Sequence, residues 1–176
     1  MQDDRIGKLA ERYNLEAYAY RDLWASILRI SGRRLLQEFA GAAVERVIDV
    51  GTGVGGLSPD VATTFPNALV VGIDRSSGML ALAPAWLSRV VADARELPIA
   101  SGSVGLVLIV FVLFHLDEPL DGLHEARRVL RSGGRVGTVT WGGELESRAS
   151  HIWTECLDKC GAAQLDPAIQ NTARSG

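Results

Sequence analysis

The sequence predicts an α/β protein with a mostly parallel sheet and helices on both faces. Short runs rich in Val, Ile and Leu alternate with helical patterns, a glycine-rich turn follows the first run, and amphipathic helices precede it. Strands that alternate with helices favour right-handed βαβ crossovers and therefore parallel strands. The expected strands cover residues 47–50, 68–73, 89–92, 104–111 and 135–141.

Helical patterns fill the remaining intervals. The connecting helices are expected at residues 57–65, 76–82 and 121–130, a turn at 132–134, and a further helix at 147–160. The first forty residues read as helix with a break at Ser31–Gly32. Its apolar face carries Leu9, Tyr13, Ala17, Tyr20, Trp24 and Leu28. This face favours core packing, with a substrate lid as the alternative.

The composition is that of one globular domain. Of 176 residues, 47% are hydrophobic and 22% charged, and the formal net charge is −3. A basic excess typical of nucleic-acid binding is absent, and no apolar run reaches the roughly 20 residues of a membrane helix. Because no basic-then-apolar leader opens the chain, we expect a cytoplasmic protein. Cys156 and Cys160 are too few for a disulfide scaffold, and no further ligands accompany them, so no metal site is expected.

A glycine-rich turn follows the first expected strand. Residues 47–56 read Val-Ile-Asp-Val-Gly-Thr-Gly-Val-Gly-Gly. Glycines allow a positive φ and a close approach of ligand to backbone, and the following helix offers unpaired N–H groups. Gly51, Gly53 and Gly56 also satisfy the dinucleotide fingerprint, with Asp74 about 20 residues further on. The turn alone therefore fits either a dinucleotide or S-adenosylmethionine.

Three carboxylates favour the second ligand. Asp49 lies two residues before the first glycine, where it would repel a pyrophosphate and attract the ammonium group of S-adenosylmethionine. Asp74 and Asp93 end or follow the next two strands, so the three acids should line one edge of the sheet. An amino-acid end, a ribose and an adenine could each find a partner there.

With these segments in this order, the sequence resembles the class I S-adenosylmethionine-dependent methyltransferases, and within them the type 11 group that includes ubiquinone- and menaquinone-biosynthesis methyltransferases. The matching segments are residues 47–56, 71–80, 91–98, 102–119 and 128–141. The resemblance implies a Rossmann-like methyltransferase fold in a single domain, residues 1–176. Its parts would be N-terminal helices at 1–44, a cofactor-binding core at 45–142 and a C-terminal helix and tail at 143–176.

The resemblance also implies residue roles at the cofactor, whose product would be S-adenosylhomocysteine. Asp49 would order the loop and reach the methionine ammonium group. Asp74 would accept hydrogen bonds from both ribose hydroxyls, and Asp93 would accept one from the adenine amino group. Met79 would line the adenine side, and Phe111 would border the transferred methyl group. The full implied set is Asp49, Gly51, Thr52, Gly53, Gly55, Asp74, Arg75, Met79, Asp93, Ala94, Val110 and Phe111.

Several positions depart from the family pattern. Arg75 stands where an apolar residue usually packs on the adenine, although an Arg can stack on a purine. Val104-Gly105 replaces a usual acidic position, and Phe114-His115 keeps one of two usual histidines. The last two family strands, an antiparallel hairpin, are not found in the sequence. A truncated chain or an uncovered fifth strand would follow, and the latter would favour a homodimer.

The expected activity is methyl transfer to a small-molecule acceptor by in-line displacement, for which the protein mainly supplies proximity and orientation. His115 is the candidate base where the acceptor must lose a proton, with loop packing as the alternative. Two other functions stay open: a non-catalytic or truncated methyltransferase fold, and a nicotinamide-dependent oxidoreductase. Asp49 and the lack of a hydride-transfer constellation disfavour the oxidoreductase.

Overall fold

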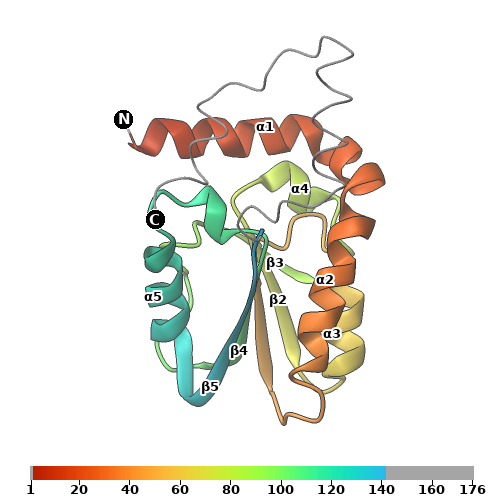
Figure 1. Ribbon diagram of the computed structural model, residues 1–176, viewed down its shortest axis with the longest axis vertical. Helices are drawn as coiled ribbons and strands as arrows, with labels where there is room; N and C mark the ends of the chain where they lie inside the picture. Colours follow the sequence, from red (N-terminus) through yellow and green to blue (C-terminus); the bar gives the residue numbers. More distant parts are fainter. Residues whose placement is uncertain (1, 142–176) are drawn as a thin grey trace, which may run out of the picture. The chain divides into compact units, whose positions relative to one another are not determined.

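Five parallel strands form the centre of the structure, a computed structural model that describes residues 2–141 (Figure 1). The strands are β1 (Arg46–Val50), β2 (Leu69–Asp74), β3 (Ser88–Val91), β4 (Val104–Val110) and β5 (Leu130–Val139). Their order in the sheet is β3-β2-β1-β4-β5, and every neighbouring pair is parallel. The predicted α/β architecture is confirmed, and all strand carboxyl ends meet at one edge.

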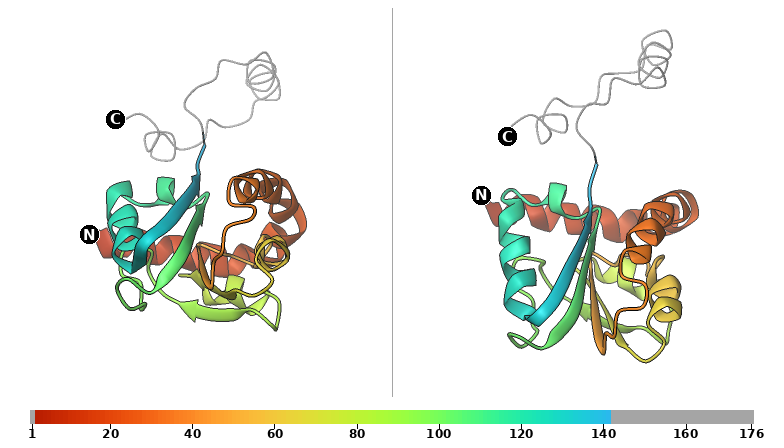
Figure 2. Two further views of the ribbon diagram at one scale, coloured as in Figure 1. Left: turned by 90° about the horizontal axis from the view of Figure 1, so that it is seen from below. Right: turned by 60° about the horizontal axis from the view of Figure 1, so that its bottom comes forward.

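Helices cover both faces of this sheet and its carboxyl-end edge. They are α1 (Gln2–Leu23), α2 (Ala25–Gln37), α3 (Ser58–Thr64), α4 (Ser77–Ala81), the short 3-10 helix η1 (Leu113–His115) and α5 (Pro119–Val129). Figures 1 and 2 show α5 on one face and α2 with α3 on the other. Helix α1 runs across the edge where the strands end (Figure 1).

Alternate residues of the central strands supply two separate cores. In β1, Val47 belongs to the cluster that includes Leu36 of α2 and Val61 of α3. Its neighbour Ile48 belongs to the cluster that includes Val129 of α5. This follows from the two-residue period of a strand, whose successive side chains point to opposite faces. Burial of both faces explains why the central strands read as continuous apolar runs.

The helix break was predicted in the wrong place. The chain turns at Trp24, between α1 and α2, and Gly32 lies inside α2. Gly32 is buried, and a Cβ there would lie 2.9 Å from the Leu57 side chain, so close packing offsets its weak helix propensity. Trp24, expected on the packed face, is 51% exposed.

The last strand also begins earlier than predicted. Leu130 pairs with Val104, and regular pairing resumes at Arg135 opposite Leu106. The intervening residues 131–134 form an irregularity within β5 at the position expected to be a turn, and Gly133 has a φ of 71°.

Some expectations lie outside the described residues. These are the helix at 147–160, the two cysteines and the presence or absence of a terminal hairpin. Between residues 2 and 141, no helix has the length and apolar character needed to cross a membrane.

Leu106 provides a test of the core. It lies on β4, and its side chain is fully buried in the cluster that includes Leu36 and Val61, so Leu106→Ala should lower the free energy of unfolding by about 2–5 kcal/mol. The matched change Leu120→Ala, at a side chain 58% exposed, should stay within about 0.5 kcal/mol. Urea unfolding measures both, and equal losses would contradict the assigned core.

Candidate functional site

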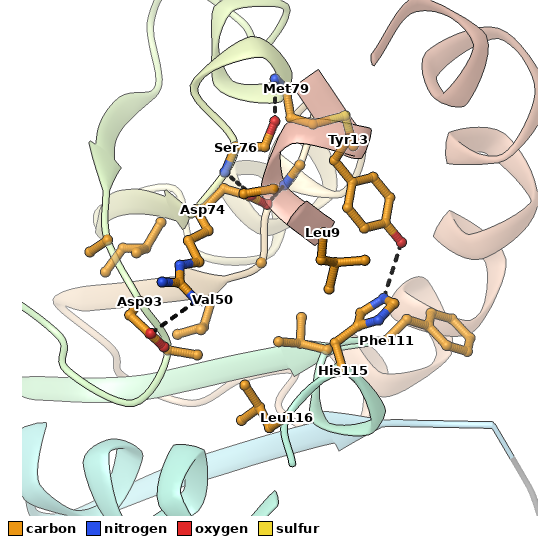
Figure 3. A pocket seen from close by; sticks show the side chains of 18 of the residues that line it. Leu9, Tyr13, Val50, Asp74, Ser76, Met79, Asp93, Phe111, His115 and Leu116 are labelled. Carbon is orange, nitrogen blue, oxygen red and sulfur yellow. Dashed lines mark hydrogen bonds and ion pairs between the residues drawn. The ribbon is translucent and has the colours of Figure 1, made fainter. Parts of the chain in front are cut away.

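A pocket lies at the carboxyl ends of β1, β2 and β4, beneath α1 (Figure 3). Its volume is about 790 Å³ with the open solvent at its mouth included, which suits a small-molecule ligand. Most of the site residues expected from sequence line it. They are Gly51, Gly53, Asp74, Arg75, Met79, Asp93, Ala94, Val110, Phe111 and His115.

The glycine turn forms the floor of the pocket. Gly51 and Gly53 have φ values of 71° and 56°, in the left-handed region that favours glycine. A Cβ on Gly51 would lie 2.0 Å from Val112 Cγ2, and one on Gly53 would lie 3.1 Å from Met79 Cε. These positions therefore require glycine for their conformation and, at Gly51, for space.

Asp49 supports this turn from beneath. Its side chain is buried, and the Thr52 hydroxyl donates a 2.7 Å hydrogen bond to its carboxylate. Burial raises the pKa of Asp49 to about 7, although the hydrogen bond from Thr52 opposes the shift. Asp49 and Thr52 line an adjoining smaller pocket, and Gly55 packs near Pro84. These three residues therefore do not line the main pocket with the rest of the expected set.

Asp74 joins the turn to the end of β2. Its carboxylate accepts 2.8 Å hydrogen bonds from the backbone N–H groups of Gly53 and Ser76. Burial raises the pKa of Asp74, and these backbone hydrogen bonds oppose the rise. Each carboxylate oxygen takes one of the two bonds and retains a lone pair, so Asp74 can still accept hydrogen bonds from a ligand in the pocket.

Asp93 differs because arginines surround it. Arg95 donates to its carboxylate at 2.8 Å, and Arg75 Nη1 lies 3.3 Å from the same oxygen. Burial alone would raise the pKa of Asp93, but hydrogen bonds from Arg95 and the charge of Arg75 together lower it. Asp93 therefore carries a negative charge that is largely satisfied within the protein.

The opposite wall of the pocket brings α1 and η1 together. The Tyr13 hydroxyl and His115 Nε2 lie 3.0 Å apart, and Figure 3 shows the hydroxyl pointing at the imidazole. Tyr20 contacts the Tyr13 ring edge to face, with centroids 5.9 Å apart. Both tyrosines line the pocket. The apolar face of α1, for which the pattern favoured core packing, therefore also forms part of the pocket wall.

Asn14 belongs to no sequence motif, yet it connects α1 to the segment after β2. Its side-chain oxygen accepts hydrogen bonds from the Ser76 hydroxyl at 2.7 Å and from the Gly78 backbone at 2.8 Å. A Cβ on Gly78 would lie 2.9 Å from Asn14 Cα, so the two segments approach closely. These bonds fix α1 to the segment after β2. They join residues more than 60 positions apart, and no local pattern announces them.

No group of three or more His, Cys, Asp or Glu suited to a metal ion occurs among residues 2–141.

Comparison with known proteins identifies the family. Residues 48–137 match the type 11 methyltransferase domain. The chain is 36% identical over 134 residues to the malonyl-[acyl-carrier protein] O-methyltransferase of Hahella chejuensis, covering 73% of this chain and 48% of that protein. It is 32% identical over 144 residues to the ubiquinone/menaquinone biosynthesis C-methyltransferase UbiE of Syntrophotalea carbinolica, covering 77% and 60%.

The solved structures agree with this result. A complex of the Haloferax volcanii Trm112 methyltransferase activator with a methyltransferase contains a chain that matches with a TM-score of 0.67 and 25% identity, over 82% of this chain and 66% of that one. The fold and pocket therefore define a protein of the class I S-adenosylmethionine-dependent methyltransferase type. The chain belongs to the type 11 methyltransferase domain family, which confirms the resemblance. It spans about half to three fifths of the length of the two curated relatives.

The raised pKa of Asp49 predicts how the stability of the protein depends on pH. Its folded-state pKa of about 7 lies above the ordinary value of 3.8, so between these values the folded state retains a proton that the unfolded state releases. The free energy of unfolding should therefore fall as pH rises from about 4 to 7. Asp49→Asn removes this contribution, so its stability relative to the parent should increase across that range.

Urea unfolding between pH 5 and about 7.5 measures the effect. Asp121→Asn, at an exposed position on α5, should keep the parent's pH dependence. A constant difference between Asp49→Asn and the parent at every pH would mean that Asp49 titrates normally.

Proposed function

We propose that this protein transfers the methyl group of S-adenosylmethionine to a small-molecule acceptor by in-line displacement. The observation that carries the proposal is the pocket in which a positive-φ glycine turn meets the Asp74 carboxylate beyond the strand ends. Membership of the methyltransferase domain family supports the same conclusion.

The pocket residues fit this cofactor. Asp74 keeps acceptor capacity for the paired hydroxyls of a ribose. Gly51 and Gly53 present backbone without side chains, which allows a methionine moiety to approach closely. Met79 offers an apolar side chain beneath an adenine, and Phe111 offers one beside the transferred methyl group.

Three roles implied by the resemblance take a modified form. Asp49 would act through the turn, because its carboxylate is buried against Thr52 and lines the adjoining pocket. Asp93 would accept a hydrogen bond from the adenine amino group while its carboxylate also accepts one from Arg95. Arg75 would stack on the adenine or shift away from Asp93 to admit it.

The chemistry then needs few protein groups. The bound cofactor supplies a methyl group already activated by the sulfonium. The chain's residues hold the acceptor in line with that methyl group and exclude water. His115 would receive a proton from acceptors that must lose one. Among the relatives, two are named for a malonyl-acyl-carrier protein and for quinones, which supports a small organic acceptor.

The net charge of the chain and the order of its strands bear on its partners. The net charge of −3 favours a small molecule over a nucleic acid. Within the described residues β5 is an edge strand, which favours a homodimer through that edge. We place the whole chain in a single methyltransferase domain that acts in the cytoplasm.

Asp74→Asn tests the cofactor site. An amide keeps one acceptor oxygen and turns its NH₂ group towards a backbone N–H, so the ribose contact and the turn both suffer. Affinity for S-adenosylhomocysteine should fall roughly 10- to 100-fold, as expected for hydrogen bonds to a charged group. Isothermal titration calorimetry measures the dissociation constants.

The control for this experiment is Asp121→Asn, which makes the same substitution at an exposed site outside the pocket. It should bind like the parent. Equal affinity of Asp74→Asn and the parent, with both folded, would remove Asp74 from the cofactor site.

A further inference from the structure

Arg75 carries a hydrogen-bond donor at the wall of the main pocket that the protein itself does not use. The residue follows Asp74 directly at the end of β2 and lines the pocket. Its Nη1 atom is buried and, among residues 2–141, has no hydrogen-bond partner. Buried donors without a partner are unfavourable and rare in native proteins, so this atom indicates a ligand that accepts its hydrogen bond.

Asp93, the nearest acidic group, does not satisfy this donor. Arg75 Nη1 lies 3.3 Å from Asp93 Oδ2 as an ion pair, without forming a hydrogen bond. Arg95 engages the carboxylate instead. Oδ1 accepts from the Arg95 backbone N–H at 2.9 Å and from Nε at 3.2 Å, and Oδ2 accepts from Nε at 3.2 Å and from Nη2 at 2.8 Å. A carboxylate has about four lone-pair sites, so charge holds Arg75 near Asp93 while its donor is left over.

This cluster of Arg75, Arg95 and Asp93 has a surplus of N–H donors, because two guanidinium groups share one carboxylate. Such a cluster favours a ligand group that accepts hydrogen bonds. Ala92 and Ala94 line the pocket on either side of Asp93 in the chain. Their side chains are single methyl groups, which suits the edge of a flat ring beside the cluster.

Adenine matches a surplus of donors. Its edges carry ring-nitrogen acceptors at N1, N3 and N7, and its donor is the amino group. With the ribose at Asp74, the base would lie beside the next residue, Arg75, whose planar guanidinium presents its N–H groups in a fork. A guanidinium stacked on the face of the base would leave Nη1 without a partner. A position at the edge of the base would supply one.

We propose that Arg75 is a specificity-determining residue for the cofactor, and that its Nη1 donates a hydrogen bond to a ring nitrogen of the adenine. This contact replaces the apolar packing that is usual in the family at this position. The inference rests on the proposed binding of S-adenosylmethionine and adds a contact that recognises the base. It also gives the ion pair a role, since Asp93 holds the guanidinium where the edge of the base arrives.

A thermodynamic cycle tests this contact through binding alone. The ligands are S-adenosylhomocysteine and its 1-deaza, 3-deaza and 7-deaza analogues, each of which has a C–H group in place of one ring nitrogen. The proteins are the parent and Arg75→Met, which keeps a long side chain but removes the N–H donors. Asp93 retains Arg95 in this variant, so the fold should persist, and urea unfolding checks that it does. Isothermal titration calorimetry gives the Kd of each pair.

We expect one analogue to bind the parent roughly 10- to 100-fold more weakly than S-adenosylhomocysteine does, the loss that accompanies a hydrogen bond to a charged group. In Arg75→Met the same two ligands should bind within about 2-fold of each other, because the contact is already absent. The analogue that shows this coupling identifies the ring nitrogen. Arg127→Met, the same substitution at an exposed position of α5, should reproduce the pattern of the parent.

The unmodified ligand separates the failure of this inference from the failure of the proposed function. If the parent does not bind S-adenosylhomocysteine, the proposed function fails and this contact fails with it. If the parent binds it but each analogue loses the same affinity in the parent and in Arg75→Met, Arg75 does not recognise a ring nitrogen. Equal affinity of the parent and Arg75→Met for S-adenosylhomocysteine would likewise remove Arg75 from cofactor recognition.

Discussion

The hydrogen bonds that close the turn after β1 are the constraint on which the site depends. Thr52 bonds to buried Asp49 at one side of the turn, and the Gly53 backbone bonds to Asp74 at the other. Together they fix a backbone of positive φ that leaves the pocket floor open. Because Asp74 belongs to β2, its hydrogen bond with Gly53 also holds the ends of β1 and β2 together. The pocket wall formed by α1 is then attached through Asn14 to the segment after β2.

The electrostatics of the site differ from those that the sequence suggests. From the sequence, Asp49 is expected to be a charge that repels a pyrophosphate. In the structure its burial raises its pKa to about 7, and its carboxylate accepts a hydrogen bond from Thr52. Asp93 reads as a free acceptor, yet Arg95 and Arg75 pair with it. Of the two acids that line the main pocket, Asp93 shares its carboxylate with Arg95 and Arg75, whereas Asp74 accepts hydrogen bonds from backbone N–H groups. The family match, rather than the charge argument, disfavours the oxidoreductase alternative.

The sequence predicts the fold well because the decisive signals are local. The buried strands are continuous apolar runs, and the positive-φ positions of the turn are occupied by glycine. It fails where tertiary contacts override propensity. Gly32 stays helical because it packs against Leu57, and residues 131–134 stay within β5 because Leu130 pairs with Val104. The contacts of Asn14 with Ser76 and of Tyr13 with His115 could not be predicted, since each joins side chains far apart in sequence.

The central claim is that the pocket of the glycine turn and Asp74 binds a sulfonium cofactor rather than a dinucleotide. Calorimetric titration of the unmodified protein with S-adenosylmethionine, S-adenosylhomocysteine and NAD in parallel tests it most directly. We expect saturable binding of the first two, with one site per chain, and no heat of binding with NAD. Binding of NAD alone, or no binding of any of the three by a folded protein, would contradict it.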